Sequence, residues 1–574
     1  FRTIEYRASD GVYINGQKVI FKGVNRHSFR PETGRTLSKA KNIEDVKLIK
    51  SMNMNAVRLS HYPADPEFLE ACDSLGLYVE CELSGWHWAH PTIVGKQLVK
   101  EMITRDENHP SIIFWSNGNE GGFNYGLEPD FAFWDKQKRV VLYPWANRNG
   151  FETKHYRSYG ETQEYMRQKE IFMPTEFLHG LYDGGHGAGL KDYWDMMMAN
   201  PRCAGGFLWD LMDQGVVRTD KNNYVDCMGN FGADGIVGPH AEKEGSYYTI
   251  KEVWCPVQLT WNDVEKGELT LSNQYNFVNL KDCRFSYRLL QMPAMGSTQV
   301  KVLKQGNLSS PDVAPGKEAQ VKIPMMANAD AVEIKAVNHE GEEIMTWSRG
   351  VKSEERRVKN SSAPSTSSAA YADQADAVEV KAGGRTYRFA KKDGRLMGVE
   401  VGSKAISLSN GPRFMAARRS DRSLDQFYNH DDKEAEKKKT LYTEFVDQGA
   451  FAGFEWKEAE AKLVATYQHG SLDEVDWQFL SDGSVAVTCH YNFGGVVDMM
   501  GMAFDYPESK VRSKAWVGNG PYRVWQNREQ GPQYGYWQND YNDPIPAESW
   551  DYPEFKGYFA NVKWMQFKTD EGKI

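Results

Sequence analysis

The chain has 574 residues, too many for a single hydrophobic core, so its length predicts about three or four domains. The formal net charge of −9 argues against a nucleic-acid partner, because phosphate binding requires a basic face. No apolar run approaches the about 20 residues of a membrane span, so no membrane partner is expected.

Aromatic residues make up 13% of the chain, which favours β-rich domains and surfaces that stack on flat rings such as sugars. The seven cysteines are scattered and odd in number, and none forms a CxxC pair. Neither a zinc site nor a disulfide framework is therefore predicted.

Residues 19–254 alternate short apolar runs with amphipathic segments such as 42–53 and 66–76. Helical periodicity followed by glycine and a strand is typical of βα units. The eight expected strands are 19–25, 55–61, 76–83, 111–120, 139–145, 153–156, 170–177 and 204–211. Eight units in this length predict a (β/α)8 TIM barrel over residues 1–254, with the first ten or so residues ending a preceding domain.

The pattern changes after residue 254. Alternating strands with few helical patterns predict an immunoglobulin-like β-sandwich over 255–351. Residues 352–377 are rich in Ser, Ala and charge and are expected to form a linker or loop. A second β-sandwich-type domain is expected over 378–574.

Chemistry-bearing side chains gather at the ends of the expected barrel strands, where TIM-barrel active sites lie. They are Asn25, Arg26, His27, Arg58, His61, Glu80, Glu82, Asn119, Glu120, Tyr156, Glu176, His179, Trp209 and Asp210. The carboxylates Glu120 and Glu176 end the fourth and seventh strands, which stand roughly opposite each other.

Two carboxylates that face each other across a cleft suit glycoside hydrolysis, one as acid and one as nucleophile when they lie about 5–5.5 Å apart. The acid needs a raised pKa, which the apolar run before Glu120 is expected to supply. Taken singly, a strand-end Glu is more often ion-paired, a His more often structural, and Trp209 more often core. The set as a whole favours carbohydrate chemistry.

Five ordered motifs carry a family resemblance: "FKGVNRHSFRPETGR", "NAVRLSHYPADPEFLEACDSLGLYV", "RDENHPSIIFWSNGNEGG", "MPTEFLHG" and "GGFLWDLMDQG". Over residues 11–254 the chain resembles glycoside hydrolase family 2, the group of β-galactosidases, β-glucuronidases and β-mannosidases. The third motif resembles the family's acid/base segment, and "MPTEFLHG" resembles its nucleophile segment.

The resemblance implies retaining hydrolysis, with Glu120 as general acid and then base, and Glu176 as nucleophile. It places Asn119 on the sugar 2-hydroxyl, while Tyr156 and Arg58 orient Glu176. It further implies sugar contacts from His27, His61 and His179, and stacking of the ring on Trp209.

Departures from the family pattern modify this picture. Bacterial β-galactosidases carry magnesium-binding Glu and His residues where this chain has Trp86 and Trp88, so no catalytic magnesium and no other cofactor is expected. The two indoles are expected to wall a subsite for a larger or less polar glycan, and a structural Ca²⁺ or Na⁺ in a loop stays open. The Asn-x-Lys signature of the β-glucuronidases is not evident in 230–245, which disfavours a carboxylated sugar. The glycine-rich segment 180–194 either shapes the cleft or crosses its rim.

The resulting hypothesis is a retaining, exo-acting β-galactosidase that removes terminal β-galactosides from oligo- or polysaccharides. The alternatives are another sugar (β-glucuronide, β-mannoside or a modified galactoside) and a catalytically silent carbohydrate-binding scaffold. The family's upstream jelly-roll and sandwich domains are absent from this sequence, which suggests truncation. The resemblance further suggests a periplasmic or extracellular location, and it leaves assembly into a homo-oligomer open.

Overall fold

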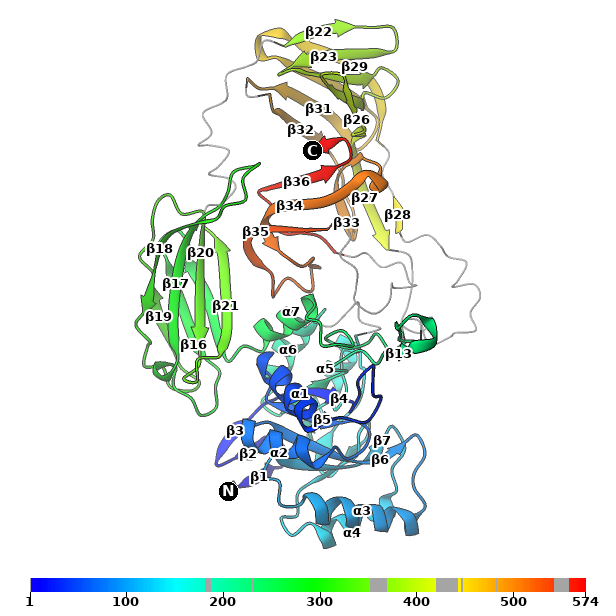
Figure 1. Cartoon of the computed structure of the whole chain (residues 1–574), viewed down its shortest axis with the longest axis vertical. Coiled ribbons are helices and arrows are strands. Elements are labelled where there is room, and N and C mark those ends of the chain that lie inside the picture. The colour runs from blue at the N-terminus through cyan, green and yellow to red at the C-terminus, as the bar shows by residue number, and fades with distance from the viewer. Residues whose placement is uncertain are drawn as a thin grey trace. The chain divides into compact units, whose positions relative to one another are not determined.

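The computed structural model describes residues 2–180, 187–228, 231–351, 369–419, 442–444, 448–481, 483–540 and 557–574 (Figure 1). The chain divides into two compact units. The first contains Phe1–Val351 with Val517–Trp537 and residues 557–563, and the second contains the described residues of 352–516, 538–540 and Trp564–Ile574.

A parallel six-stranded sheet forms most of the predicted barrel, in the order β12-β4-β5-β6-β7-β8. Its strands are β4 Phe21–Arg26, β5 Ala56–Leu59, β6 Tyr78–Trp86, β7 Ile112–Asn119, β8 Val141–Leu142 and β12 Gly205–Leu208. β10 (Phe151–Glu152) pairs in parallel with β11 (Ile171–Phe172), and parallel bridges from Phe172 to Cys203 and from Phe177 to Leu208 connect β11 towards β12. The sixth strand, expected over 153–156, instead ends at Glu152, so His155 and Tyr156 lie in the loop that follows it.

Helices connect the barrel strands, as the βα periodicity predicted. They are α1 Lys39–Ser51, α2 Pro66–Leu75, α3 Thr92–Asp106, α4 Glu128–Trp134, α5 Tyr159–Tyr165, α6 Leu190–Met198 and α7 Gly245–Val253. Local chemistry sets their ends: the Ser38 hydroxyl caps α1, and α2 ends at Gly76 in the left-handed region. Ser158 and Glu161 form a reciprocal capping box at the start of α5.

An aromatic core fills the barrel at the N-terminal ends of its strands. The rings of Phe21 and Phe151 each contact Phe114 edge-on, with centroids 5.4 and 5.5 Å apart. The antiparallel β1 (Ile4–Arg7), β2 (Gly11–Ile14) and β3 (Gln17–Val19) add Val12 and Val19 to this cluster. The barrel interior is therefore closed at this end, and its polar residues gather at the other.

A two-sheet β-sandwich follows the barrel within the first unit. One sheet contains β15 Val257–Asp263, β16 Glu268–Asn273 and β19 Glu318–Lys322; the other contains β18 Lys301–Leu308, β17 Arg284–Gln291, β20 Ala331–Val337 and β21 Glu343–Gly350. Lys251 of α7 pairs with Glu343 at 3.0 Å, and the Asn53 amide donates to the Ile344 carbonyl at 3.0 Å. These bonds tie the sandwich to the barrel.

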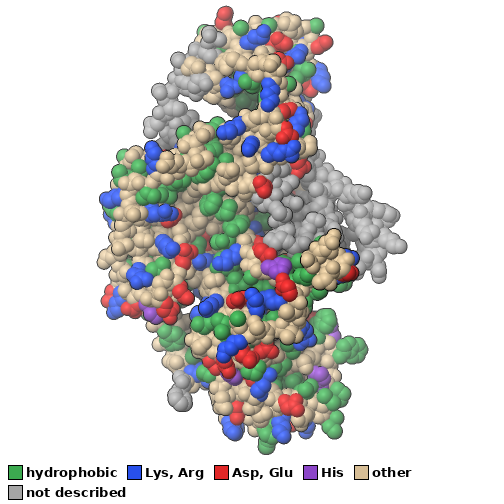
Figure 2. Space-filling view, viewed as in Figure 1, with side chains coloured by type: hydrophobic (Ala, Val, Ile, Leu, Met, Phe, Trp, Pro, Cys, Tyr) green, Lys and Arg blue, Asp and Glu red, His purple; other side chains and the backbone are tan. Residues whose placement is uncertain are grey.

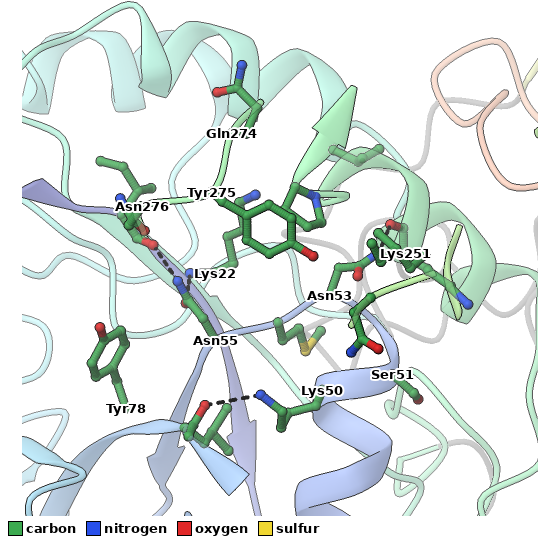
Figure 3. A pocket seen from close by; sticks show the side chains of 18 of the residues that line it. Lys22, Lys50, Ser51, Asn53, Asn55, Tyr78, Lys251, Gln274, Tyr275 and Asn276 are labelled. Atoms are coloured by element: carbon green, nitrogen blue, oxygen red, sulfur yellow. Dashed lines mark hydrogen bonds between the residues drawn. The ribbon is translucent and has the colours of Figure 1, made fainter. Parts of the chain in front are cut away.

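A cavity of about 1210 Å³ lies between the barrel and this sandwich (Figure 3). Lys22, Asn55 and Tyr78 line it from the N-terminal ends of barrel strands, and Tyr275 and Asn276 line it from the sandwich. Because catalytic groups of TIM barrels lie at the opposite strand ends, this cavity is not the candidate active site.

The second unit is built of antiparallel sheets. Its strands are β22 Ala370–Asp373, β23 Ala377–Ala382, β24 Arg385–Ala390, β25 Leu396–Val401, β26 Lys404–Ile406, β27 Ser409–Arg419, β28 Tyr442–Glu444, β29 Ala450–Lys457, β30 Lys462–Gln468, β31 Leu472–Phe479, β32 Val485–Tyr491, β33 Met499–Asp505, β36 Trp564–Thr569 and β37 Gly572–Lys573. β34 (Val511–Gly520) and β35 (Gln533–Asp540) contribute residues to both units. Of the linker expected over 352–377, residues 352–368 lie outside the described residues. The expectation is wrong for Ala370–Asp373, which form β22 and pair with β23.

Acidic and basic side chains are interspersed over the described surface shown in Figure 2 and are not gathered into one basic face. None of the helices in the described part of the chain is long and apolar enough to cross a membrane.

Candidate active site

Glu120 stands at the C-terminal end of β7, on a turn that only glycines permit. Gly118 has φ +73°, and a Cβ there would lie 2.4 Å from the Gly122 carbonyl oxygen. A Cβ on Gly122 would lie 2.3 Å from the carbonyl oxygen of Gly85. These close backbone approaches turn the chain sharply after the buried strand and leave Glu120 at the barrel mouth.

The two predicted carboxylates lie together. One oxygen of Glu120, one oxygen of Glu176 and one ring nitrogen of His155 all lie within 4.8 Å of one another. Glu176 is buried and follows β11, whereas the Glu120 side chain keeps 17% of its surface exposed. This separation is close to the about 5–5.5 Å of retaining glycosidases and shorter than the about 6.5–9.5 Å of inverting ones.

Both oxygens of Glu176 are held. Arg58 Nη1 donates to Oε1 at 2.5 Å, and the Tyr156 hydroxyl donates to Oε2. Burial together with the neighbouring Glu176 raises the pKa of Tyr156 well above its usual value, so the phenol keeps its proton. Hydrogen bonds to both oxygens fix the position of Glu176, as a nucleophile requires.

Glu120 has a different environment from the one expected. Its Oε1 lies 3.0 Å from His155 Nδ1, and the Trp86 indole donates to Oε2 at 3.4 Å. Burial raises the pKa of Glu120, but His155, Trp86 and His87 outweigh burial and lower it to about 2. The apolar run before Glu120 forms β7 and is buried. The raised pKa that was expected from this run is wrong, because the net shift of the Glu120 pKa is downward.

Arg58 is the buried centre of the site. Its Nε donates to Glu82 Oε2 at 2.9 Å and its Nη2 to Asn119 Oδ1 at 2.6 Å. Burial lowers the pKa of Arg58, but Glu82, Glu176 and Glu80 outweigh burial and raise it, so Arg58 stays charged. The other polar atom of the Asn119 side chain, the buried Nδ2, has no hydrogen-bond partner among the described residues. This donor is free for a ligand hydroxyl.

Aromatic rings form one side of the site. Trp209 stacks on His61 with centroids 5.2 Å apart and 11° between planes, and His27 meets it edge-on at 5.4 Å. The Trp209 indole donates to Asp234 Oδ2 at 2.9 Å, and His179 Nε2 lies 3.7 Å from the same oxygen. Burial is the main cause that lowers the pKa values of His27 and His61 to about 3, which leaves neutral imidazoles suited to hydroxyl groups.

The structure therefore brings most of the predicted site residues together at one end of the barrel. They are His27, Arg58, His61, Trp86, Asn119, Glu120, Tyr156, Glu176, His179 and Trp209. A bulge in β6 between Leu83 and Trp86 sets Trp86 beside Asn119 at the rim, where its side chain is 59% exposed. Trp88 is 85% exposed, two residues further on.

Sequence reasoning missed His155 and Asp234 as site residues and gave Glu82 no role. His155 precedes the predicted Tyr156 by one residue, and this proximity is the one signal that pointed to it. Asp234 lies in an irregular segment with no motif that links it to Trp209. Part of the segment 180–194, namely 181–186, lies outside the described residues.

The magnesium site that the resemblance implies does not fit the residues present. Trp86 and Trp88 occupy the expected ligand positions, and an indole N–H donates hydrogen bonds and offers no lone pair to a cation. Trp86 Nε1 in fact donates to Glu120. Glu120, His155 and Glu176 are close enough to share a cation, but all three side chains are engaged in the hydrogen bonds described above. In the second unit, Glu474, Asp476 and His490 have donor atoms within 4.8 Å of one another and could hold a cation.

Comparison with known proteins agrees with this geometry. The chain matches the family models "Glycosyl hydrolases family 2, TIM barrel domain" over residues 7–240, "Beta-galactosidase, domain 4" over 269–346 and "Beta galactosidase small chain" over 381–573. A β-galactosidase from Oenococcus oeni is 23% identical over 96% of this chain and 59% of the relative. A β-galactosidase from Photobacterium profundum is 30% identical over 51% of this chain and 32% of the relative.

The chain thus matches between 32% and 59% of the length of these two relatives. Among solved structures, a GH2 β-galacturonidase from Eisenbergiella tayi is 22% identical, with a TM-score of 0.36 over 44% of this chain and 54% of that chain. The three matched models follow one another along most of the sequence. The barrel domain of this chain thus belongs to glycosyl hydrolase family 2, and the two matched regions after it belong to β-galactosidase domain families.

Proposed function

We propose that this chain is the catalytic part of a retaining β-galactosidase. The observation that carries the proposal is the approach of Glu120 and Glu176 within 4.8 Å at the barrel mouth. Arg58 and Tyr156 donate hydrogen bonds to the two oxygens of Glu176, and Glu120 lies nearer to the solvent, where a leaving group would stand. This asymmetry favours Glu176 as nucleophile and Glu120 as acid/base.

In the first step, a Glu176 oxygen attacks the anomeric carbon while the glycosidic bond breaks and Glu120 delivers a proton to the departing oxygen. The result is a glycosyl ester on Glu176 and a free alcohol. In the second step, Glu120 takes a proton from water as that water attacks the same carbon and releases Glu176. Two inversions give net retention.

The galactoside preference rests on the β-galactosidase names of the matched models and relatives. The free Asn119 Nδ2 suits the sugar 2-hydroxyl, and the neutral imidazoles of His27 and His61 suit other hydroxyls. The exposed Trp86 and Trp88 suit the next residue of an oligo- or polysaccharide, which fits exo-action on a terminal galactoside.

The test is hydrolysis of nitrophenyl β-galactoside, β-glucoside, β-glucuronide and β-mannoside by the full chain and by Glu176→Gln. We expect cleavage of the galactoside, β-configured product by NMR before mutarotation, and loss of activity in the variant. A 2-deoxy-2-fluoro-galactoside should label Glu176, as read by peptide mass. Cleavage of a different glycoside in place of the galactoside would overturn the galactoside preference, and a product of inverted configuration would overturn the retaining mechanism. Binding without cleavage by the folded wild type would favour the carbohydrate-binding scaffold.

A further inference from the structure

His155 lies between the two carboxylates and has no place in the mechanism above. Its side chain is 1% exposed, in the loop that follows β10. Nδ1 lies 3.0 Å from Glu120 Oε1 and 3.5 Å from Glu176 Oε2. On the other side of the ring, Nε2 lies 2.8 Å from the Thr175 hydroxyl. One buried imidazole therefore contacts both the acid/base and the nucleophile.

From the Thr175 contact we infer which ring nitrogen carries a permanent proton. The Thr175 hydroxyl donates to the Thr153 carbonyl at 3.4 Å, so its oxygen is free to accept from Nε2–H. With Nε2 protonated, Nδ1 is an acceptor in the neutral ring and a donor in the cationic ring. The contact between Nδ1 and Glu120 Oε1 then requires one proton, carried by either partner.

We propose that Glu120 and His155 form an acid/base pair that stores one proton between Glu120 Oε1 and His155 Nδ1. This inference deepens the proposed function and rests on it. His155 is here a positioning residue, since it acts through Glu120. The first chemical step removes the shared proton from the pair through Glu120 to the departing oxygen. The second step returns one proton from the attacking water to the pair, so protons balance over the cycle.

The electrostatic reason lies in the crowding of negative charge. Two carboxylates within 4.8 Å repel each other, and a proton on either Glu120 or Nδ1 relieves that repulsion. A protonated ring would also face Glu176 at 3.5 Å and stabilise the ionised nucleophile. The ionisable groups around His155 are Glu82, Glu120, Glu176, Arg58, His61 and Tyr156. Arg58 already pairs with Glu82 and Glu176 and lies 3.5 Å from the carboxyl group of Glu80, which leaves His155 to serve Glu120.

The pH dependence of kcat/KM tests the pair in the full chain. In the wild type, the fall of kcat/KM at high pH reports the loss of the shared proton from the pair. In His155→Gln, the same fall reports the loss of the proton from Glu120 alone. Because ordinary carboxyl groups lose their proton about two pH units below ordinary imidazoles, we expect the alkaline limb to move to lower pH by at least about one unit. The variant His109→Gln removes a matched ring–carboxylate pair, with Asp73 at 2.6 Å, and should leave the profile unchanged. An unmoved alkaline limb in His155→Gln would overturn the proposal.

Leaving-group dependence separates proton storage from a purely structural role. A dinitrophenyl leaving group departs without protonation, whereas a phenyl group needs it. We expect His155→Gln to lose at least about tenfold more kcat/KM on the phenyl glycoside than on the dinitrophenyl glycoside, a difference of about 1.4 kcal/mol in the barrier. Equal losses on both substrates would assign His155 to packing alone.

A spectroscopic measurement keeps the proposal testable if the proposed function itself fails. In ¹⁵N-histidine NMR of the full chain, the His155 ring signals are identified by their absence from His155→Gln. We expect a ring protonated at Nε2 whose pH-dependent change moves to lower pH in Glu120→Gln, because the carboxylate that favours the second proton is gone. Signals that titrate identically in wild type and Glu120→Gln would overturn the pair whether or not any glycoside is cleaved.

Discussion

Glu80 is a buried carboxyl group whose replacement should alter the pH dependence of stability. It lies on β6 below the active site, and neither of its oxygens has a hydrogen-bond partner among the described residues. The Arg58 guanidinium lies beside Glu80, with Nε 3.5 Å from Oε1. Burial raises the pKa of Glu80 from 4.5 to about 8, and Arg58 only partly opposes this shift. The folded protein therefore holds Glu80 protonated at neutral pH.

The sign of the effect follows from proton counting. Between pH 4.5 and about 8 the folded state keeps a proton on Glu80 that the unfolded chain releases. The free energy of unfolding therefore falls as pH rises through this window, by about 1.4 kcal/mol per pH unit for one group. Over the window the loss is on the order of 4 kcal/mol. Glu80→Gln removes the titrating group while keeping its shape, so the variant should match the wild type near pH 5 and exceed its stability near pH 8.

Urea unfolding of the full chain at pH 5, 6, 7 and 8, followed by tryptophan fluorescence, measures this difference. The exposed Glu101→Gln on α3 is the matched control and should follow the wild-type curve. Parallel pH curves for wild type and Glu80→Gln would refute the reasoning, because they would mean that Glu80 is ionised in the folded barrel. Glu82, whose pKa burial raises to about 7, remains in the variant and keeps part of the slope.

Tyr156→Phe removes the hydroxyl donor to Glu176 and should lower kcat/KM about 10- to 100-fold. This loss corresponds to the about 1.5–3 kcal/mol of a hydrogen bond to a charged group. The control Tyr159→Phe, on exposed α5, should leave kcat/KM unchanged. Unchanged kinetics in Tyr156→Phe would mean that the hydroxyl does not hold the nucleophile. Asn119→Ala should lower kcat/KM for a galactoside but leave kcat/KM for a 2-deoxygalactoside nearly unchanged. The reason is that a 2-deoxy sugar has no 2-hydroxyl for Nδ2 of Asn119 to bind. Equal losses on both substrates would contradict this role. Gly118→Ala should lower the thermal stability more than Gly121→Ala. Both glycines have positive φ, but of the two only Gly118 has backbone atoms closer than 3 Å to an added Cβ. Equal shifts in Tm would refute the clash.

Much of the fold is predictable because its signals are periodic. Seven of the eight expected strands overlap the observed ones, since parallel barrel strands are long apolar runs bounded by turn residues. The sixth is displaced: β10 covers Phe151–Glu152 and ends before the expected range begins. The residues expected over 153–156 are instead held by side-chain bonds, such as that from Thr153 to the Tyr143 carbonyl.

The active site is predictable where residues sit at strand ends and less so where partners come from elsewhere. Glu120 follows β7 directly and Glu176 comes shortly after β11, which ends at Phe172, so their convergence follows from barrel geometry. The low pKa of Glu120 depends on His155, which reaches it from another strand's loop, and no local pattern encodes that distance. Asp234 reaches Trp209 from 25 positions further along the chain, beyond the antiparallel pair β13 (Val216–Arg218) and β14 (Tyr224–Asp226).

The aromatic core at the N-terminal ends of the barrel strands leaves the polar residues of the proposed reaction site at the opposite ends. In the proposed reaction, departing alcohol and incoming water both meet Glu120 there, beside Trp86. The alcohol released in the first step therefore vacates the place that water takes in the second. In the proposed reaction, any hydroxyl compound that reaches this place competes with water for the glycosyl group on Glu176.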